Sequence, residues 1–143
     1  MAGEALDGTE RELPGDLGGA PAVLLFGYDQ DAQFDADRWL LGLLQAETPV
    51  EVLEVPTIPG FAPRVLAGRI DDGMRSGIPA EDWRSVVTLY GADAAAITEL
   101  TGNQNPRNMR VLLVDGEGLI RWFHDRGFSA GVLLELDALA REL

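Results

Sequence analysis

One stretch limits the fold of this chain more than any other, and it reads AVLLFGYDQDAQFDADRWLLGLL from residue 22 to residue 44. Its first five residues form a continuous apolar run between Pro21 and Gly27, which is typical of a buried strand. Leucine and alanine residues at helical spacing then predict a helix over residues 34–46. A buried strand that leads into a helix N-terminus is a common place for an active site in an α/β domain.

Turn residues and hydrophobic periodicity predict the other elements. Asp7-Gly8 indicates a hairpin near the N-terminus, and Asp93 and Ser129 are candidate caps of two helices. Residues 50–55, VEVLEV, alternate apolar and acidic residues and predict a strand with one exposed face. The remaining predictions are strands over residues 22–26, 85–90, 111–114 and 119–123, helices over 61–70, 94–100 and after residue 129, and a loop or short helix over 71–82.

This order of elements predicts an α/β fold with a mixed central sheet. Strands that alternate with helices favour parallel pairing, and the closing hairpin adds antiparallel strands, so helices are expected on both faces. A length of 143 residues fits one domain with its own core. We therefore predict a single domain over residues 1–143, with an N-terminal hairpin extension at 1–20 and an irregular or helical insertion at 56–82.

The composition removes several classes of chemistry. The chain has no cysteine and no lysine, which excludes disulfides, thiol catalysis, iron–sulfur clusters, Schiff bases and a Walker-type phosphate lysine. One histidine cannot build a multi-histidine metal site. The net charge of −13 opposes binding to nucleic acid and to anionic lipid.

The sequence gives little information on location. No apolar run approaches the ~20 residues of a membrane span, and no signal peptide is visible. We expect a soluble protein that is cytoplasmic as given, while a periplasmic or other exported location stays open if the N-terminus was truncated.

Five segments of the chain, taken in order, resemble thioredoxin-like proteins in the elaborated form of peroxiredoxins and periplasmic thiol-disulfide proteins. The segments are LDGTERELP, DLGGAPAVLLF, VEVLEVP, VVTLY and VLLVDGEGLIRWFHDRG, within residues 5–143. The resemblance implies a thioredoxin-like three-layer sandwich with an added N-terminal β-hairpin. A narrower resemblance links VLLVDGEGLIRW to the thioredoxin-like assembly factor of the mitochondrial ATP synthase.

The turn after the first central strand departs from that family. Redox-active relatives carry a nucleophilic cysteine there, usually in C-x-x-C, whereas this chain reads YDQDAQ at residues 28–33. The resemblance puts Gln30 and Gln33 near the cysteine positions, so thiol-disulfide oxidoreductase and peroxidase activities are excluded. Relatives also tend to carry a cis-proline immediately before a later strand, for which Pro106, five residues ahead of Val111, is the candidate.

Two other features offer chemistry without cysteine. The acidic turn of Asp29, Asp31, Asp35 and Asp37 could hold a hard cation, but it lacks the glycine and terminal glutamate of an EF-hand, and solvated acids at a helix start are the simpler interpretation. His124 could be a general base, and a surface residue at a strand end is its simpler interpretation. We predict no metal site and no cofactor.

The resemblance favours a binding function. Thioredoxin-like folds bind extended chain near the proline loop, and loss of the cysteines removes the chemistry without removing recognition. We therefore predict a non-redox protein-binding module of the assembly or chaperone type. The candidate groove residues are Tyr28, Asp29, Gln30, Gln33, Trp39, Asn105, Pro106 and Arg107.

Several alternatives stay open at this stage. The chain could be an enzyme that uses the acidic turn or His124, or a structural or oligomerising domain. Trp39 and Phe61 are either exposed aromatic anchors or core residues. Arg107 and Arg110 either bind a partner's carboxylates or pair with the chain's own surplus acids.

Overall fold

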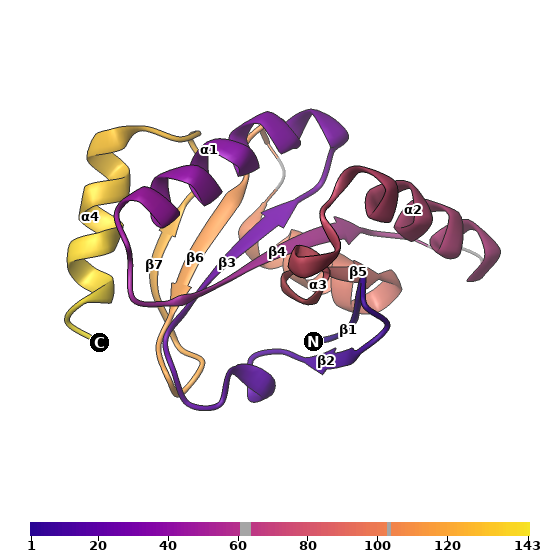
Figure 1. Cartoon of the computed structure of the whole chain (residues 1–143), viewed down its shortest axis with the longest axis horizontal. Helices are drawn as coiled ribbons and strands as arrows, with labels where there is room; N and C mark the ends of the chain where they lie inside the picture. The colour runs from indigo at the N-terminus through magenta and orange to yellow at the C-terminus, as the bar shows by residue number, and fades with distance from the viewer. Residues whose placement is uncertain (61–63, 103) are drawn as a thin grey trace.

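The computed structural model describes residues 1–60, 64–102 and 104–143, and these residues form one seven-stranded sheet (Figure 1). The strands are β1 (Ala2–Ala5), β2 (Glu10–Glu12), β3 (Ala22–Gly27), β4 (Glu51–Ile58), β5 (Val87–Tyr90), β6 (Arg110–Val114) and β7 (Ile120–His124). They lie in the order β2-β1-β5-β4-β3-β6-β7. Strands β3, β4 and β5 are parallel, and the strands on either side pair antiparallel. The predicted mixed sheet is confirmed.

Helices cover both faces of this sheet. The helices are α1 (Gln33–Gln45), α2 (Arg64–Gly77), α3 (Gly91–Thr101) and α4 (Ala130–Ala140), with short 3₁₀ turns η1 (Gly15–Leu17), η2 (Gln30–Ala32) and η3 (Ala80–Ser85). Helices α1 and α4 pack on one face together with Val23 and Leu25 of β3. Helix α3 packs on the other face with Leu24 and Phe26 of the same strand. Because β3 is buried on both faces, its apolar run is continuous rather than alternating.

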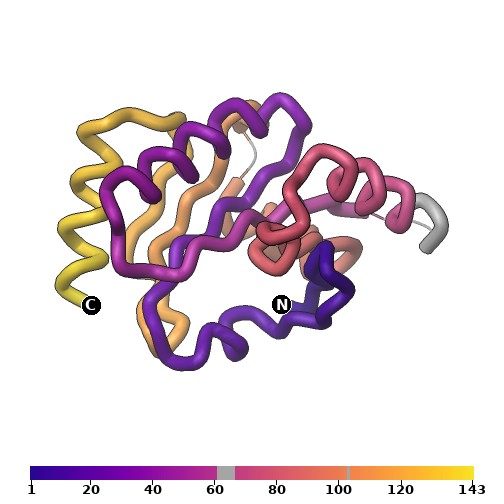
Figure 2. The backbone as a smooth tube through the Cα atoms, viewed as in Figure 1, coloured from indigo at the N-terminus to yellow at the C-terminus, as the bar shows by residue number. Residues whose placement is uncertain are grey.

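Helix α2 lies at the opposite end of the molecule from α4 (Figure 2). Asp71 is the one buried residue among positions 67–77, and it accepts a hydrogen bond from the hydroxyl of Tyr90 at 3.0 Å. Arg75 donates to the carbonyl oxygen of Leu6 at 2.7 Å. Polar contacts therefore hold this helix against the sheet and the N-terminal hairpin.

The course of α2 corrects the prediction of a helix over residues 61–70 and a loop or short helix over 71–82. The helix continues to Gly77 and so includes Gly68 and Gly73, where a Cβ would meet no atom within 4 Å. An ion pair between Arg75 and Asp72 spans one helical turn there. Phe61 lies outside the described residues.

The two predicted helix caps have different outcomes. The Ser129 hydroxyl accepts the N–H of Val132 at 3.3 Å and caps α4 as predicted. Asp93 does not cap α3, because the helix begins earlier, at Gly91. Its carboxylate instead accepts the N–H of Ala2 at 2.8 Å and connects α3 to the N-terminal strand.

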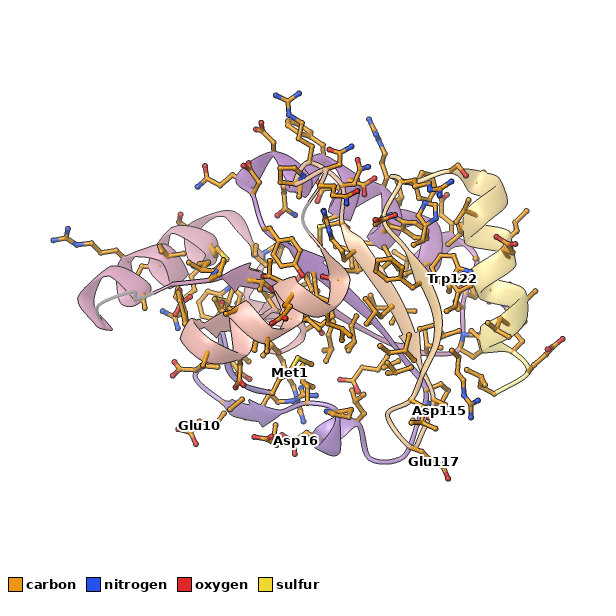
Figure 3. All side chains as sticks on the ribbon, turned by 180° about the vertical axis from the view of Figure 1, so that it is seen from behind. Met1, Glu10, Asp16, Asp115, Glu117 and Trp122 are labelled. Carbon is orange, nitrogen blue, oxygen red and sulfur yellow. The ribbon has the colours of Figure 1, made fainter. Side chains whose placement is uncertain are left out.

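The turn between β6 and β7 lies against the N-terminal segment. A Cβ on Gly116 would overlap the carbonyl oxygen of Gly19. Figure 3 shows Asp16 and Asp115 at the same end of the molecule. The described part of the chain contains no helix long and apolar enough to cross a membrane.

Candidate functional site

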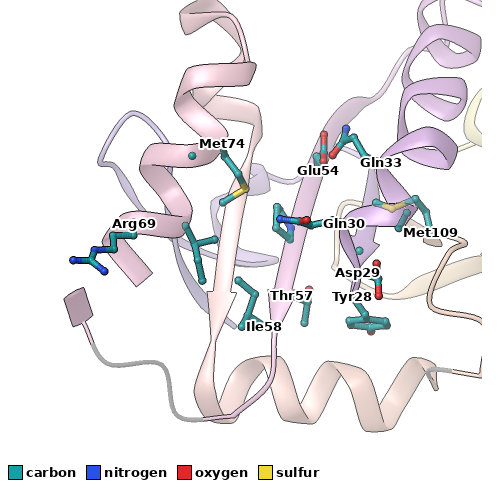
Figure 4. A pocket seen from close by; sticks show the side chains of 15 residues that line it. Tyr28, Asp29, Gln30, Gln33, Glu54, Thr57, Ile58, Arg69, Met74 and Met109 are labelled. Carbon is teal, nitrogen blue, oxygen red and sulfur yellow. The ribbon is translucent and has the colours of Figure 1, made fainter. Parts of the chain in front are cut away.

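The turn that follows β3 opens into a cleft of about 740 Å³. The cleft lies between this turn, the end of β4 and helix α2 (Figure 4). It is lined by Gly27, Tyr28, Asp29, Gln30, Ala32, Gln33, Glu54, Pro56, Thr57, Ile58, Arg69, Ile70, Gly73, Met74 and Met109. Four of the eight groove candidates, Tyr28, Asp29, Gln30 and Gln33, are therefore brought together here.

Asp29 shapes the turn itself. Its carboxylate accepts the N–H of Asp31 at 2.9 Å and so caps the short 3₁₀ helix that precedes α1. Gln33 begins α1 and donates to the carboxylate of Asp37 at 3.0 Å. Gln30 and Gln33, which the resemblance assigned to the cysteine positions, are both exposed at the cleft.

Tyr28 forms the end of the cleft that lies towards α3. Its hydroxyl is bonded to the Thr101 hydroxyl and donates to the carbonyl oxygen of Ile97 at 3.3 Å. Burial raises the pKa of the Tyr28 phenol, while its hydrogen-bond partners and the nearby Arg110 act in the opposite direction. The Arg110 guanidinium lies 5.1 Å from the centre of the Tyr28 ring, within the range of a cation–π contact.

Arg110 is buried, with 1% of its surface exposed, and no carboxylate of the described residues pairs with it. It donates to the carbonyl oxygens of Gly102, Asn105 and Asn108 at 2.9, 2.6 and 2.8 Å. Arg110 therefore holds the loop before β6 in place, and it does not pair with the surplus acids as the simpler interpretation proposed.

The loop before β6 carries the other groove candidates, and they lie outside the lining of the cleft. Arg107 forms a 3.6 Å ion pair with Asp31, and both side chains are largely exposed. Asn105 is exposed and Pro106 is half-buried. The Asn105–Pro106 bond is trans, since the cis bond in the described residues is Leu13–Pro14. The residue directly before β6 is Met109, which was not among the predicted groove residues and which reaches the cleft.

Trp39 lies in the core rather than in the cleft. Its side chain is fully buried, and its ring makes edge contacts with Trp122, His124 and Phe128 at centroid distances of 6.2, 5.8 and 5.3 Å. The interpretation of Trp39 as a core residue is therefore correct, because α1 turns this side chain towards β6, β7 and α4.

The acidic turn is divided between structural roles. Asp35 is buried, and its carboxylate accepts the N–H of Met109 at 2.9 Å and that of Phe128 at 2.7 Å. The prediction of solvated acids is thus wrong for Asp35. The described residues contain no group of three or more acids and histidines arranged to hold a metal ion. His124 is half-buried, and its Nε2 bonds to the carbonyl oxygen of Gly127 at 2.8 Å.

Glu54 is another lining residue that was not among the predicted groove residues. It is 8% exposed at the floor of the cleft, and burial raises the pKa of its carboxyl. Asp37 raises this pKa further, and Gln33, beside Glu54 in Figure 4, lowers it. The sequence contained a signal that one of the acids of β4 is buried. Glu51 and Glu54 are three residues apart, so in a strand their side chains must point to opposite faces of the sheet. The predicted single exposed acidic face is wrong: Glu51 is exposed and Glu54 is not.

Comparisons with known proteins bear on the fold. No family model and no curated protein matches the chain. Among solved structures, the exposed lipoprotein thioredoxin of Streptococcus pneumoniae is 16% identical, with 100% of this chain and 98% of that chain covered and a TM-score of 0.66. Copper-bound ScoI of Arabidopsis thaliana is 14% identical, with 100% and 97% covered and a TM-score of 0.62. A secreted disulfide oxidoreductase of Mycobacterium tuberculosis is 18% identical, with 100% and 96% covered and a TM-score of 0.55.

Proposed function

We propose that this chain, which has the thioredoxin-like fold without its cysteines, binds a segment of another protein in the cleft between residues 28–33, β4 and α2. It performs no thiol chemistry there, because the chain contains no cysteine. In this proposal the function is recognition, as in an assembly or chaperone module. The fold itself is compatible with many functions, so the function must be inferred from the cleft.

The open cleft is the observation that carries the proposal. Its volume of about 740 Å³ is within the range of binding sites in proteins, and it lies where a buried strand leads into a helix. Ile58, Ile70 and Met74 supply apolar surface, and exposed Asp29 and Gln30 supply hydrogen-bonding groups at the edge. This mixture suits a peptide, which offers apolar side chains and a polar backbone together.

Copper binding, which one of the similar structures displays, is not part of the proposal. Copper(I) sites use soft sulfur ligands or imidazoles. The chain has no cysteine and one histidine, and that histidine already bonds to the carbonyl oxygen of Gly127. The residues present therefore do not fit a copper site of that kind.

The proposal covers more than one compartment. Two of the similar proteins are described as an exposed lipoprotein and a secreted protein, and an exported location is compatible with this chain. A cysteine-free cleft has the same chemistry in reducing and oxidising surroundings. Recognition through Asp29 and Gln30 would therefore operate inside and outside the cytoplasm.

Selection from a library of random linear peptides tests the proposal. We expect peptides that bind the wild-type chain and that bind Gln30→Arg at least about tenfold more weakly, because the longer charged side chain fills the cleft edge. Gln104→Arg is the matched control, since Gln104 is exposed and lies outside the lining. If no selected peptide is sensitive to Gln30→Arg, the cleft is not a peptide site.

A further inference from the structure

A second groove adjoins the cleft along the other side of Glu54. It measures about 930 Å³ and lies between α1, the start of β4 and the segment from α2 to η3. Gln33, Glu54, Gly73 and Met74 line both cavities, so the two are continuous. Val50 and Val52 of the β4 region contribute to the same groove.

Large apolar side chains are exposed at this groove. Leu41 and Leu44 on α1 are 55% and 74% exposed, and both belong to the lining. Ile78 faces them from the segment after α2 and is half-buried. A concave site with apolar residues at its rim marks an interaction surface, whereas single exposed leucines elsewhere need no explanation.

The charged residues that line the groove are all acids. Its lining includes the acids Asp37, Glu47, Glu54 and Asp82 and no arginine. None of the ion pairs among the described residues involves these four acids. Glu54 is more than nine-tenths buried and lies where the groove meets the first cleft.

We propose that this groove binds a basic segment of a partner protein, whose apolar side chains lie against Leu41 and Leu44 and whose lysine or arginine reaches Glu54. Complementary charge selects such a partner, because an unpaired acid in a half-buried site is best satisfied by a cationic donor. Burial raises the pKa of this carboxyl, and a cation beside it would lower the pKa again.

Charge also argues against a second copy of this chain as the occupant. Each copy carries a net charge of −13, so self-association through this groove would bring acidic faces together. The proposal rests on the proposed function, since the groove continues the peptide cleft, and it adds the chemistry of the partner and a second set of contacts.

The same peptide selection, analysed by composition and with groove variants, tests this inference. We expect the selected peptides to be enriched in lysine or arginine beside leucine-type residues and depleted in acids. Leu44→Ser should weaken their binding by about tenfold or more, and Leu134→Ser should leave it unchanged, because Leu134 is 63% exposed on α4 away from the groove.

A second pair of variants separates the specific contact from general attraction to an acidic protein. Glu54→Gln should weaken binding of the lysine- or arginine-containing peptides at least about fivefold, and Glu135→Gln, an exposed acid on α4, by less than about twofold. A cooperative thermal unfolding transition at or above the wild-type temperature in each variant shows that the fold is retained. Equal losses in the two variants would indicate non-specific charge attraction and overturn the inference.

The outcomes distinguish this inference from the proposed function. Peptides that are sensitive to Gln30→Arg but insensitive to Leu44→Ser would support the cleft and overturn the groove. The reverse pattern would support the groove and overturn the cleft. A dimer in sedimentation equilibrium that dissociates on Leu44→Ser would identify a second copy as the occupant and overturn the basic partner.

Discussion

The carboxylate of Asp35, at the start of α1, accepts the backbone N–H of Met109, which directly precedes β6, at 2.9 Å. The two residues are 74 positions apart in the chain. The same carboxylate accepts the N–H of Phe128 at 2.7 Å, so one buried side chain fixes the first turn of α1 to two loops.

Loss of this carboxylate should destabilise the fold. We expect Asp35→Ala to lower the free energy of unfolding by about 2–3 kcal/mol, because two buried N–H groups lose a charged acceptor. Asp37→Ala, two residues further along the same helix and exposed, should change it by less than about 0.5 kcal/mol. Urea denaturation of both variants measures the difference, and equal effects would contradict the structural role of Asp35.

Arg110 should be required for order in the loop before β6. Arg110→Met leaves the carbonyl oxygens of Gly102, Asn105 and Asn108 without their donor, and we expect a loss of about 2 kcal/mol in unfolding free energy with faster amide exchange in residues 104–109. Arg107→Met removes an exposed ion pair and should cost less than about 0.5 kcal/mol. Similar exchange rates in the two variants would refute this role.

Glu54 should give stability an unusual dependence on pH. Its folded pKa is raised above the ordinary value of 4.5 chiefly by burial, so the folded state retains a proton that the unfolded chain has lost. The contribution of Glu54 is therefore complete below pH 4.5 and declines as pH rises through the folded pKa. We expect Glu54→Gln to be more stable than wild type at pH 8, with the difference disappearing at pH 4. A difference that is constant between these pH values would contradict the raised pKa.

Replacement of glycine by alanine should destabilise the protein in the turn between β6 and β7 and stabilise it at the exposed start of α4. Gly116→Ala places a methyl group against the carbonyl oxygen of Gly19 and should destabilise the protein by about 1–3 kcal/mol. Gly131→Ala, where a Cβ meets no atom inside α4, should stabilise it by about 0.5–1 kcal/mol. Thermal unfolding measures both, and a neutral Gly116→Ala would show that residues 14–19 do not press on the turn.

Local patterns were sufficient for much of the fold. The continuous apolar run of β3, the helix after it and the Ser129 cap each depend on residues adjacent in sequence, and the structure confirms all three. Local patterns failed where a distant contact decides the outcome. Asp93 looks like a helix cap, yet it bonds to Ala2, which is 91 positions away.

The candidate site was predicted only in part for the same reason. The turn could be located from the strand before it. The depth of the cleft depends on α2, which forms the facing wall and whose extent was hard to predict because glycines interrupt its sequence. Met109 and Glu54 reach the cleft because of sheet order, which places β3 between β4 and β6. The sequence left the role of Trp39 open, because the residues that pack around its side chain come from α4 and β7, which are distant in the chain.

Helix α2 is a wall of both cavities, so a ligand that moves this helix would link the occupancy of one cavity to that of the other. Among positions 67–77 of this helix, Asp71 is the one buried residue. If a ligand in the cleft displaces α2, it changes the affinity of the groove by some factor, and by reciprocity a ligand in the groove changes the affinity of the cleft by the same factor. A single partner that fills both cavities would then bind them cooperatively. Two separate peptides, one for each cavity, would show this cooperativity only when they are titrated together.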